Sequence, residues 1–116
     1  MVRNLLIALS ISGLLVASET SAQSVAGPYL AGRHAAVNSD YREAAAYYAQ
    51  ALARDPSNSE LVESAVLSYL SLGEVDKALP LARVLETQNS SSQVAHLVIM
   101  AGLAQQGKFA DLLDRP

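Results

Sequence analysis

The side chains best suited to catalysis in this 116-residue sequence are two histidines and two glutamates. His34 and His96 could act as general bases or metal ligands, but neither has a second ligand at helical spacing, and no serine in an elbow motif lies near His34. Glu60 and Glu63 could form a carboxylate pair, but a solvated helix face with one of them in a cap explains them better. We therefore expect no catalytic residue, no metal ligand and no cofactor site, and we expect that the protein is not an enzyme.

Composition narrows the classes of function further. The glycines are isolated, so no loop can cradle a phosphate. The formal net charge of −3, with no basic patch, argues against nucleic-acid binding. Cysteine is absent, which excludes disulfides, cysteine-based zinc sites and a thiol nucleophile. The tripeptide Asn89-Ser90-Ser91 fits a glycosylation sequon, but it is better explained as a turn.

The clearest structural element is the stretch Tyr41–Pro56. It follows Asp40, a good N-cap residue, and it ends at Asp55-Pro56, where proline disfavours helical geometry in the residue before it. Small and bulky apolar residues recur within it at steps of three and four, which predicts one apolar helix face: Ala44, Tyr47, Tyr48, Ala51 and Leu52. A single helix cannot bury such a face alone, so a packing partner is expected.

A period of 34 residues in the sequence indicates what this helix packs against. Ser39, Gly73 and Gly107 are spaced by 34 residues, and each lies at a break between two helical runs. An apolar residue follows each break at the same distance, at Tyr41, Val75 and Phe109. The pattern predicts repeated helical hairpins that pack against one another.

Residues Tyr29–Asn58 resemble a tetratricopeptide (TPR) repeat. The resemblance rests on a small residue in the first helix, an acidic-aromatic pair at the turn and a closing Asp-Pro, here Gly32, Asp40-Tyr41, Glu43-Ala44, Tyr48, Ala51-Leu52 and Asp55-Pro56. A second copy, Ser59–Ser92, keeps Tyr69, Gly73, Ala78 and Leu79 but has Val66 and Ala82 where a small residue and an aromatic belong. A third begins near Gln93 and keeps mainly Gly107-Lys108-Phe109.

Local signals set the expected helix limits. Pro28 is expected to open the first helix, which runs to about Asn38. Ser57 and Glu60 form a candidate capping box for the third helix, which Gly73 ends and which neighbours should contact on both sides. The fourth helix, 75–88, contains Pro80 and is expected to kink without breaking. A serine of the loop 89–92 should cap a fifth helix, 93–106, and a sixth begins with residues 109–113.

The N-terminus has the three-part plan of a secretory signal peptide. One positive charge is followed by the apolar run Leu5–Ala17 and by small residues that end at Ala22, where cleavage is expected. The run is short for a membrane span, so an uncleaved anchor is the second alternative. The expected organisation is a signal peptide (1–22), a tether (23–27), repeat 1 (28–58), repeat 2 (59–92) and a partial repeat 3 (93–116). The absence of cysteine favours a bacterial periplasmic location over a eukaryotic secreted one.

The resemblance implies an all-α fold, a short right-handed TPR solenoid of antiparallel helix hairpins after an N-terminal signal helix. It also implies a concave groove, lined by the first helix of each repeat, that binds a protein segment. By position this groove would contain Tyr29, Arg33, Glu63, Leu67, Leu70, Leu97, Ala101 and Gln105. The Lys/Asn set with which chaperone-type TPR domains hold a terminal carboxylate is absent. An apolar or mildly basic segment is therefore the expected partner.

Three hypotheses of function remain open at this stage. The first is a non-catalytic protein-interaction scaffold of the bacterial cell envelope. The second is a non-catalytic N-terminal part of a larger envelope enzyme or assembly protein, because the third repeat is incomplete and the fifth helix is too apolar for an outer surface. The third is self-association of the chain through these C-terminal helices. Contact with a membrane is expected only if the signal segment is retained.

Overall fold

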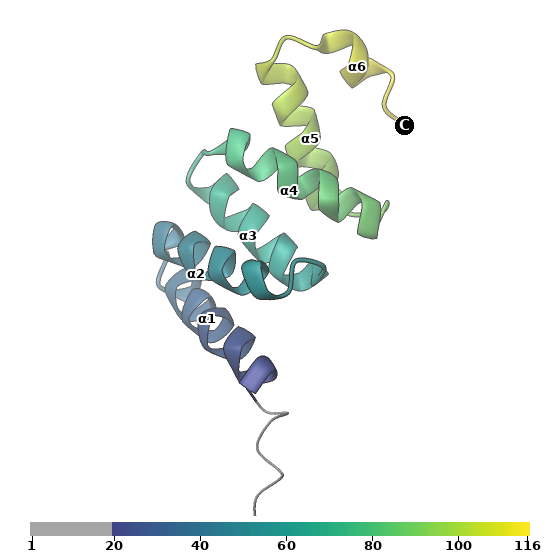
Figure 1. Ribbon diagram of the computed structural model, residues 1–116. Coiled ribbons are helices and arrows are strands. Elements are labelled where there is room, and N and C mark those ends of the chain that lie inside the picture. Colours follow the sequence, from purple (N-terminus) through teal and green to yellow (C-terminus); the bar gives the residue numbers. More distant parts are fainter. Residues whose placement is uncertain (1–19) are drawn as a thin grey trace, which may run out of the picture.

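The computed structural model describes residues 20–116, with side chains from residue 25 onward. This part of the chain is all-α and contains six helices: α1 (Thr20–Val37), α2 (Tyr41–Arg54), α3 (Ser59–Ser71), α4 (Val75–Gln88), α5 (Gln93–Gln105) and α6 (Phe109–Leu113). Figure 1 shows them stacked in chain order, with α1 and α2 at one end and α5 and α6 at the other. Each helix packs mainly against the next one in the chain.

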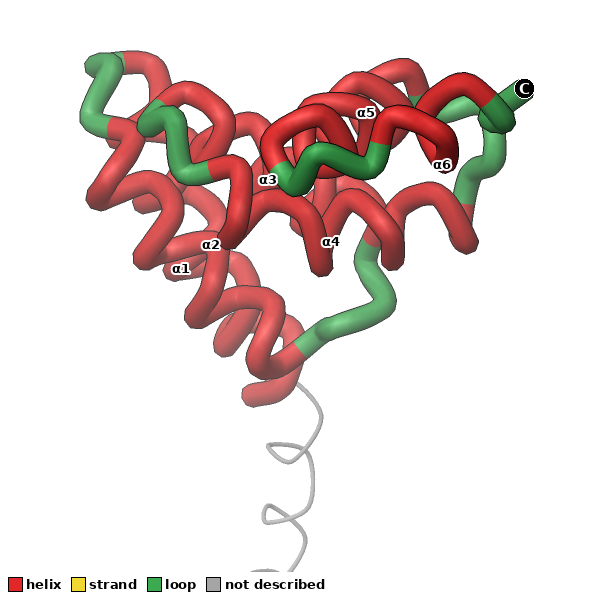
Figure 2. The backbone as a smooth tube through the Cα atoms, turned by 90° about the horizontal axis from the view of Figure 1, so that it is seen from above, coloured by secondary structure: helices red, strands yellow, loops and turns green. Residues whose placement is uncertain are grey.

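The core consists of two apolar clusters that meet at α3. The N-terminal cluster combines α1 and α2 with Leu61 and Ala65 of α3. The C-terminal cluster combines α4 and α5 with Val62 and Val66, also from α3. Because α3 buries a different set of residues on each side, it is the central helix of the stack, as its wide apolar surface predicts. Figure 2 shows α3 between the N-terminal pair and the C-terminal helices.

The residues spaced by 34 adopt the same turn three times. Ser39, Gly73 and Gly107 have φ angles of 60°, 74° and 71°, in the left-handed region. At each turn the N–H of this residue and the N–H of the next residue donate to two carbonyl groups in the last turn of the preceding helix. For Gly73 and Glu74 the acceptors are Leu70 and Tyr69, at 2.9 Å each. This is a Schellman motif, so the predicted role of Gly73 at the end of α3 is confirmed.

Ser39 is the one member of this series with a Cβ in the left-handed region. Ser39→Gly is therefore expected to raise the free energy of unfolding by about 0.5–1 kcal/mol. Gly73→Ala is expected to lower it by about 1 kcal/mol, because it introduces the same steric conflict. Urea unfolding followed by circular dichroism measures both, with Ser57→Gly as a loop control that gives no gain. A Ser39→Gly protein that is no more stable than wild type would contradict this account of the turn.

Two predicted caps are confirmed and one is wrong. The N–H of Glu43 donates to Asp40 Oδ1, and the N–H of Ala95 donates to Ser92 Oγ, each at 3.2 Å. Ser57, however, does not cap α3. Its neighbour Asn58 does, because Asn58 Oδ1 accepts from the N–H of Leu61 at 3.2 Å, which starts α3 one residue later than the capping box would.

Pro28 and Pro80 lie inside helices. The prediction that Pro28 opens the first helix is wrong, since α1 already includes residues 20–27. Val25, which precedes Pro28, packs on the N-terminal cluster, so tertiary packing favours helix there despite the missing backbone hydrogen bond. Pro80 lies in α4, which continues unbroken to Gln88, as predicted.

The predicted signal peptide lies almost entirely outside the described residues, and its cleavage stays a prediction. From Thr20 to Pro116, no helix combines the length and the hydropathy that a membrane crossing requires.

Candidate partner-binding surface

The eight residues predicted to line a groove come from α1, α3 and α5, the first helix of each hairpin. Tyr29 and Ala101 are half-buried, and the other six are exposed: Arg33, Glu63, Leu67, Leu70, Leu97 and Gln105. Their exposure leaves them available to a partner. Their role as a binding site stays a prediction.

The end of this surface near α1 is polar and preorganised. The Tyr29 hydroxyl donates a short hydrogen bond to Glu60 Oε1, which joins α1 to α3. This hydrogen bond, together with desolvation and the negative charge of Glu60, raises the pKa of Tyr29, so its phenol stays protonated at neutral pH. The Arg33 guanidinium lies 5.9 Å from the centre of the Tyr29 ring, within cation–π range.

Tyr29 also connects this surface to the core. Its ring centre lies 6.4 Å from that of Tyr48, a buried residue of α2, with the two planes tilted by 52°. Tyr48 in turn covers Gly32, where a Cβ would come within 2.8 Å of the Tyr48 ring. A glycine is therefore required at position 32 for α1 to approach α2 this closely.

The remainder of the surface is apolar. Leu67 is 43% exposed on α3, and Leu97 is 60% exposed on α5. Leu70 and Met100 are exposed on the same two helices. Large apolar side chains exposed together are typical of sites that bind another protein.

Sequence reasoning missed two residues of this surface. Glu60 was assigned to a capping box, whereas its carboxylate accepts from Tyr29, 31 residues away. No local pattern indicates that bond, because it depends on how two hairpins pack. Met100 was not chosen, although it lies three residues after Leu97 on one helix face, which is a signal that could have found it.

His96 Nε2 lies 3.9 Å from Glu86 Oε1, and the other contacts of both histidines are to groups close to them in the sequence. His34 Nε2 lies 3.2 Å from Asn38 Nδ2 in the same turn of chain. His96 Nε2 lies 2.9 Å from the Ser90 carbonyl oxygen, to which it donates. The described residues contain no group of three or more His, Cys, Asp or Glu side chains that could hold a metal ion.

Comparison with protein families decides what this stack is. Residues 29–93 match the family model described as tetratricopeptide repeat, which is more than half of the chain. The chain belongs to the tetratricopeptide repeat family. TPR repeats generally mediate protein–protein interactions and bind protein or peptide partners, and TPR domains are typically non-catalytic. Searches of curated proteins and of solved structures gave no significant match.

Proposed function

We propose that this TPR protein is a non-catalytic interaction scaffold of the bacterial cell envelope that binds a segment of another protein across α1, α3 and α5. The observation that carries the proposal is a set of four exposed apolar side chains on α3 and α5: Leu67, Leu70, Leu97 and Met100. A soluble protein that leaves these four side chains uncovered gains from burying them against a partner.

Charge determines which kind of segment fits best. Glu60 and Glu63 lie on α3, in the part of the surface that adjoins α1. Arg33 is the basic residue of the predicted groove, and its guanidinium lies over Tyr29. The proposed partner is therefore a segment with apolar residues for α3 and α5 and a basic residue for the acidic pair. The envelope location rests on the N-terminal signal-peptide pattern of the sequence.

Leu67→Glu is expected to abolish binding, because it places a charge among these exposed apolar side chains. Its side chain is exposed, so the substitution should leave the fold intact. The measurement is a pull-down from envelope extract with the wild type and the variant, followed by mass spectrometry. Val84→Glu is the matched control, since Val84 is an exposed apolar residue of α4, outside the predicted surface. Identical partner lists for wild type and Leu67→Glu would remove this surface from the proposal.

Self-association is a second candidate, favoured by a different observation. Phe109 is 61% exposed at the start of α6, and Leu113 is exposed at its end. Two copies of the chain could bury these side chains against each other. Light scattering of the purified protein distinguishes the candidates: a monomer excludes self-association, whereas a dimer that Phe109→Glu dissociates supports it.

A further inference from the structure

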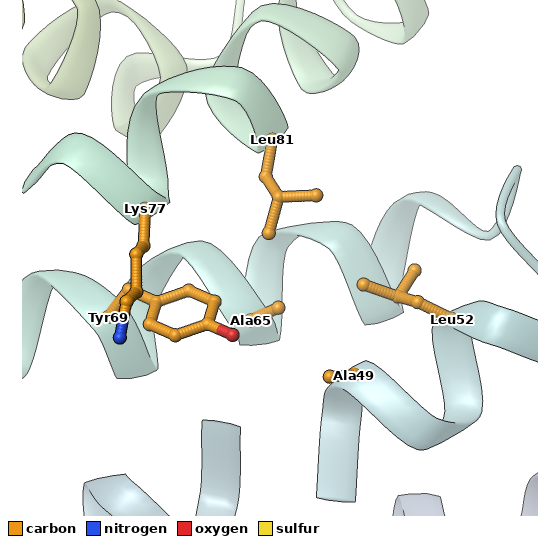
Figure 3. A pocket seen from close by; sticks show the side chains of 6 residues that line it. All are labelled: Ala49, Leu52, Ala65, Tyr69, Lys77 and Leu81. Carbon is orange, nitrogen blue, oxygen red and sulfur yellow. The ribbon is translucent and has the colours of Figure 1, made fainter. Parts of the chain in front are cut away.

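A cavity of about 370 Å³ lies between successive hairpins, and none of the predicted groove residues lines it. Its lining comes from α2, α3 and α4: Ala49, Leu52, Ala65, Tyr69, Lys77 and Leu81. Figure 3 shows Lys77 and Tyr69 on one side of it and Leu52 and Ala49 on the other, with Leu81 and Ala65 between them. The walls are mostly apolar, with one ammonium group and one hydroxyl among them, which is the usual character of a small-molecule site.

The next junction along the stack carries different residues at the positions that line this cavity. A shift of 34 residues places Ile99 at the position of Ala65, Glu86 at that of Leu52 and Arg115 at that of Leu81. Ile99 is larger than Ala65 and is fully buried. Arg115 and Glu86 form an ion pair that spans the second junction. At the first junction these three positions are Leu52, Ala65 and Leu81, which line the cavity. All three are uncharged, and Ala65 is smaller than Ile99.

The polar side of the cavity can bind an anion. The Tyr69 hydroxyl makes no hydrogen bond within residues 25–116, and it points toward Ala65 (Figure 3). Lys77 Nζ lies 6.0 Å from the centre of the Tyr69 ring and 3.2 Å from Glu74 Oε2. An ammonium group has three donors, so Lys77 can bind a second carboxylate beside Glu74, although Glu74 competes for it.

We propose that this cavity, lined by Ala49, Leu52, Ala65, Tyr69, Lys77 and Leu81, binds an amphiphilic carboxylate such as a medium-chain fatty acid. The acyl chain lies against Ala49, Leu52 and Leu81, above the buried Ala65. The carboxylate accepts hydrogen bonds from the Lys77 ammonium. This site does not depend on the proposed protein-binding surface.

Decanoate, kept below its micelle concentration, is the probe. Titration into the methyl-labelled full chain, followed by NMR, is expected to give saturable shifts at the methyl groups of Leu52, Ala65 and Leu81. Ala49→Leu fills the mouth of the cavity from an exposed position and is expected to weaken binding at least tenfold. Ala46→Leu, also exposed on α2 but outside the lining, is the matched control and should change affinity less than twofold.

Two charge variants test the polar contact. Lys77→Gln is expected to weaken decanoate binding about threefold, as an exposed ion pair would, and to leave decanol binding unchanged. Glu74→Gln removes the competing carboxylate and should tighten decanoate binding. Thermal unfolding of each variant confirms that it is folded. Absence of saturable shifts at the three methyl-bearing residues, or equal affinities for Ala49→Leu and Ala46→Leu, would overturn the proposal.

Discussion

Tyr48→Ala is expected to lower the free energy of unfolding by about 3–5 kcal/mol, as truncation of a buried aromatic does. Tyr48 is 3% exposed and belongs to the N-terminal cluster. Its ring lies against Gly32, where a Cβ would come within 2.8 Å of it. The truncation therefore leaves a cavity between α1 and α2, and the Tyr29 ring loses its aromatic neighbour. Equilibrium unfolding in urea measures the change.

Tyr47→Ala is the matched control for this prediction. Tyr47 precedes Tyr48 on α2, but it is only half-buried and belongs to neither core cluster. Its truncation is expected to cost about 1 kcal/mol or less, as is usual away from the core. Equal losses for the two tyrosines would show that Tyr48 does not hold α1 against α2 as described.

Ile99→Ala is expected to lower the free energy of unfolding by about 2–5 kcal/mol. This is the usual range when a buried isoleucine is truncated and its surroundings fill the cavity only in part. Ile99 is fully buried in α5 and packs with residues of α3 and α4 in the C-terminal cluster. Its loss should loosen the end of the stack that carries Leu97 and Met100. The proposed partner should then also bind less well, because two of its apolar contacts are no longer held in place.

Met100→Ala separates that effect from a general sensitivity of α5. Met100 follows Ile99 directly but is exposed. We expect a stability change below about 1 kcal/mol for Met100→Ala, together with a loss of partner binding. If Met100→Ala were as unstable as Ile99→Ala, the assignment of Ile99 to the core and of Met100 to the surface would be wrong.

The repeat period explains why much of the fold was predictable from the sequence. Ser39, Gly73 and Gly107 indicated the three tight turns from the sequence alone, because the left-handed residue that ends a helix recurs at a fixed place in each repeat and is most often glycine. The same period also indicates the correct N-cap of α3. Ser92 caps α5, and the residue 34 positions earlier is Asn58, which caps α3. The capping-box pattern at Ser57 was a local signal, and the repeat register was the stronger one.

The start of α1 could not be predicted from local rules. Proline is favoured at the first position of a helix, which made Pro28 the natural start. The helix instead extends to Thr20, with Val25 packed on the N-terminal cluster. Here tertiary packing outweighs the local preference of proline for the first position of a helix. Such packing cannot be predicted from the sequence of one helix alone.

The candidate surface was predictable only in part. The positions of Leu67 and Leu97 within their repeats predicted that these residues line the surface, and both side chains are exposed in the structure. The bond between Tyr29 and Glu60 depends on the distance between two hairpins. The cavity beside Lys77 depends on the size of residues in three helices. Such features arise from the assembled stack, so periodicity alone does not predict them.

Amide hydrogen exchange of Tyr48→Ala and Ile99→Ala tests the central claim most directly, that these helices form an open stack in which each hairpin is stabilised by its neighbours. In such a stack a defect acts most strongly where it lies. We predict that Tyr48→Ala reduces protection chiefly in α1 and α2, and that Ile99→Ala reduces it chiefly in α4 and α5. The same loss of protection across all helices in both variants would contradict an open stack and indicate a single closed core.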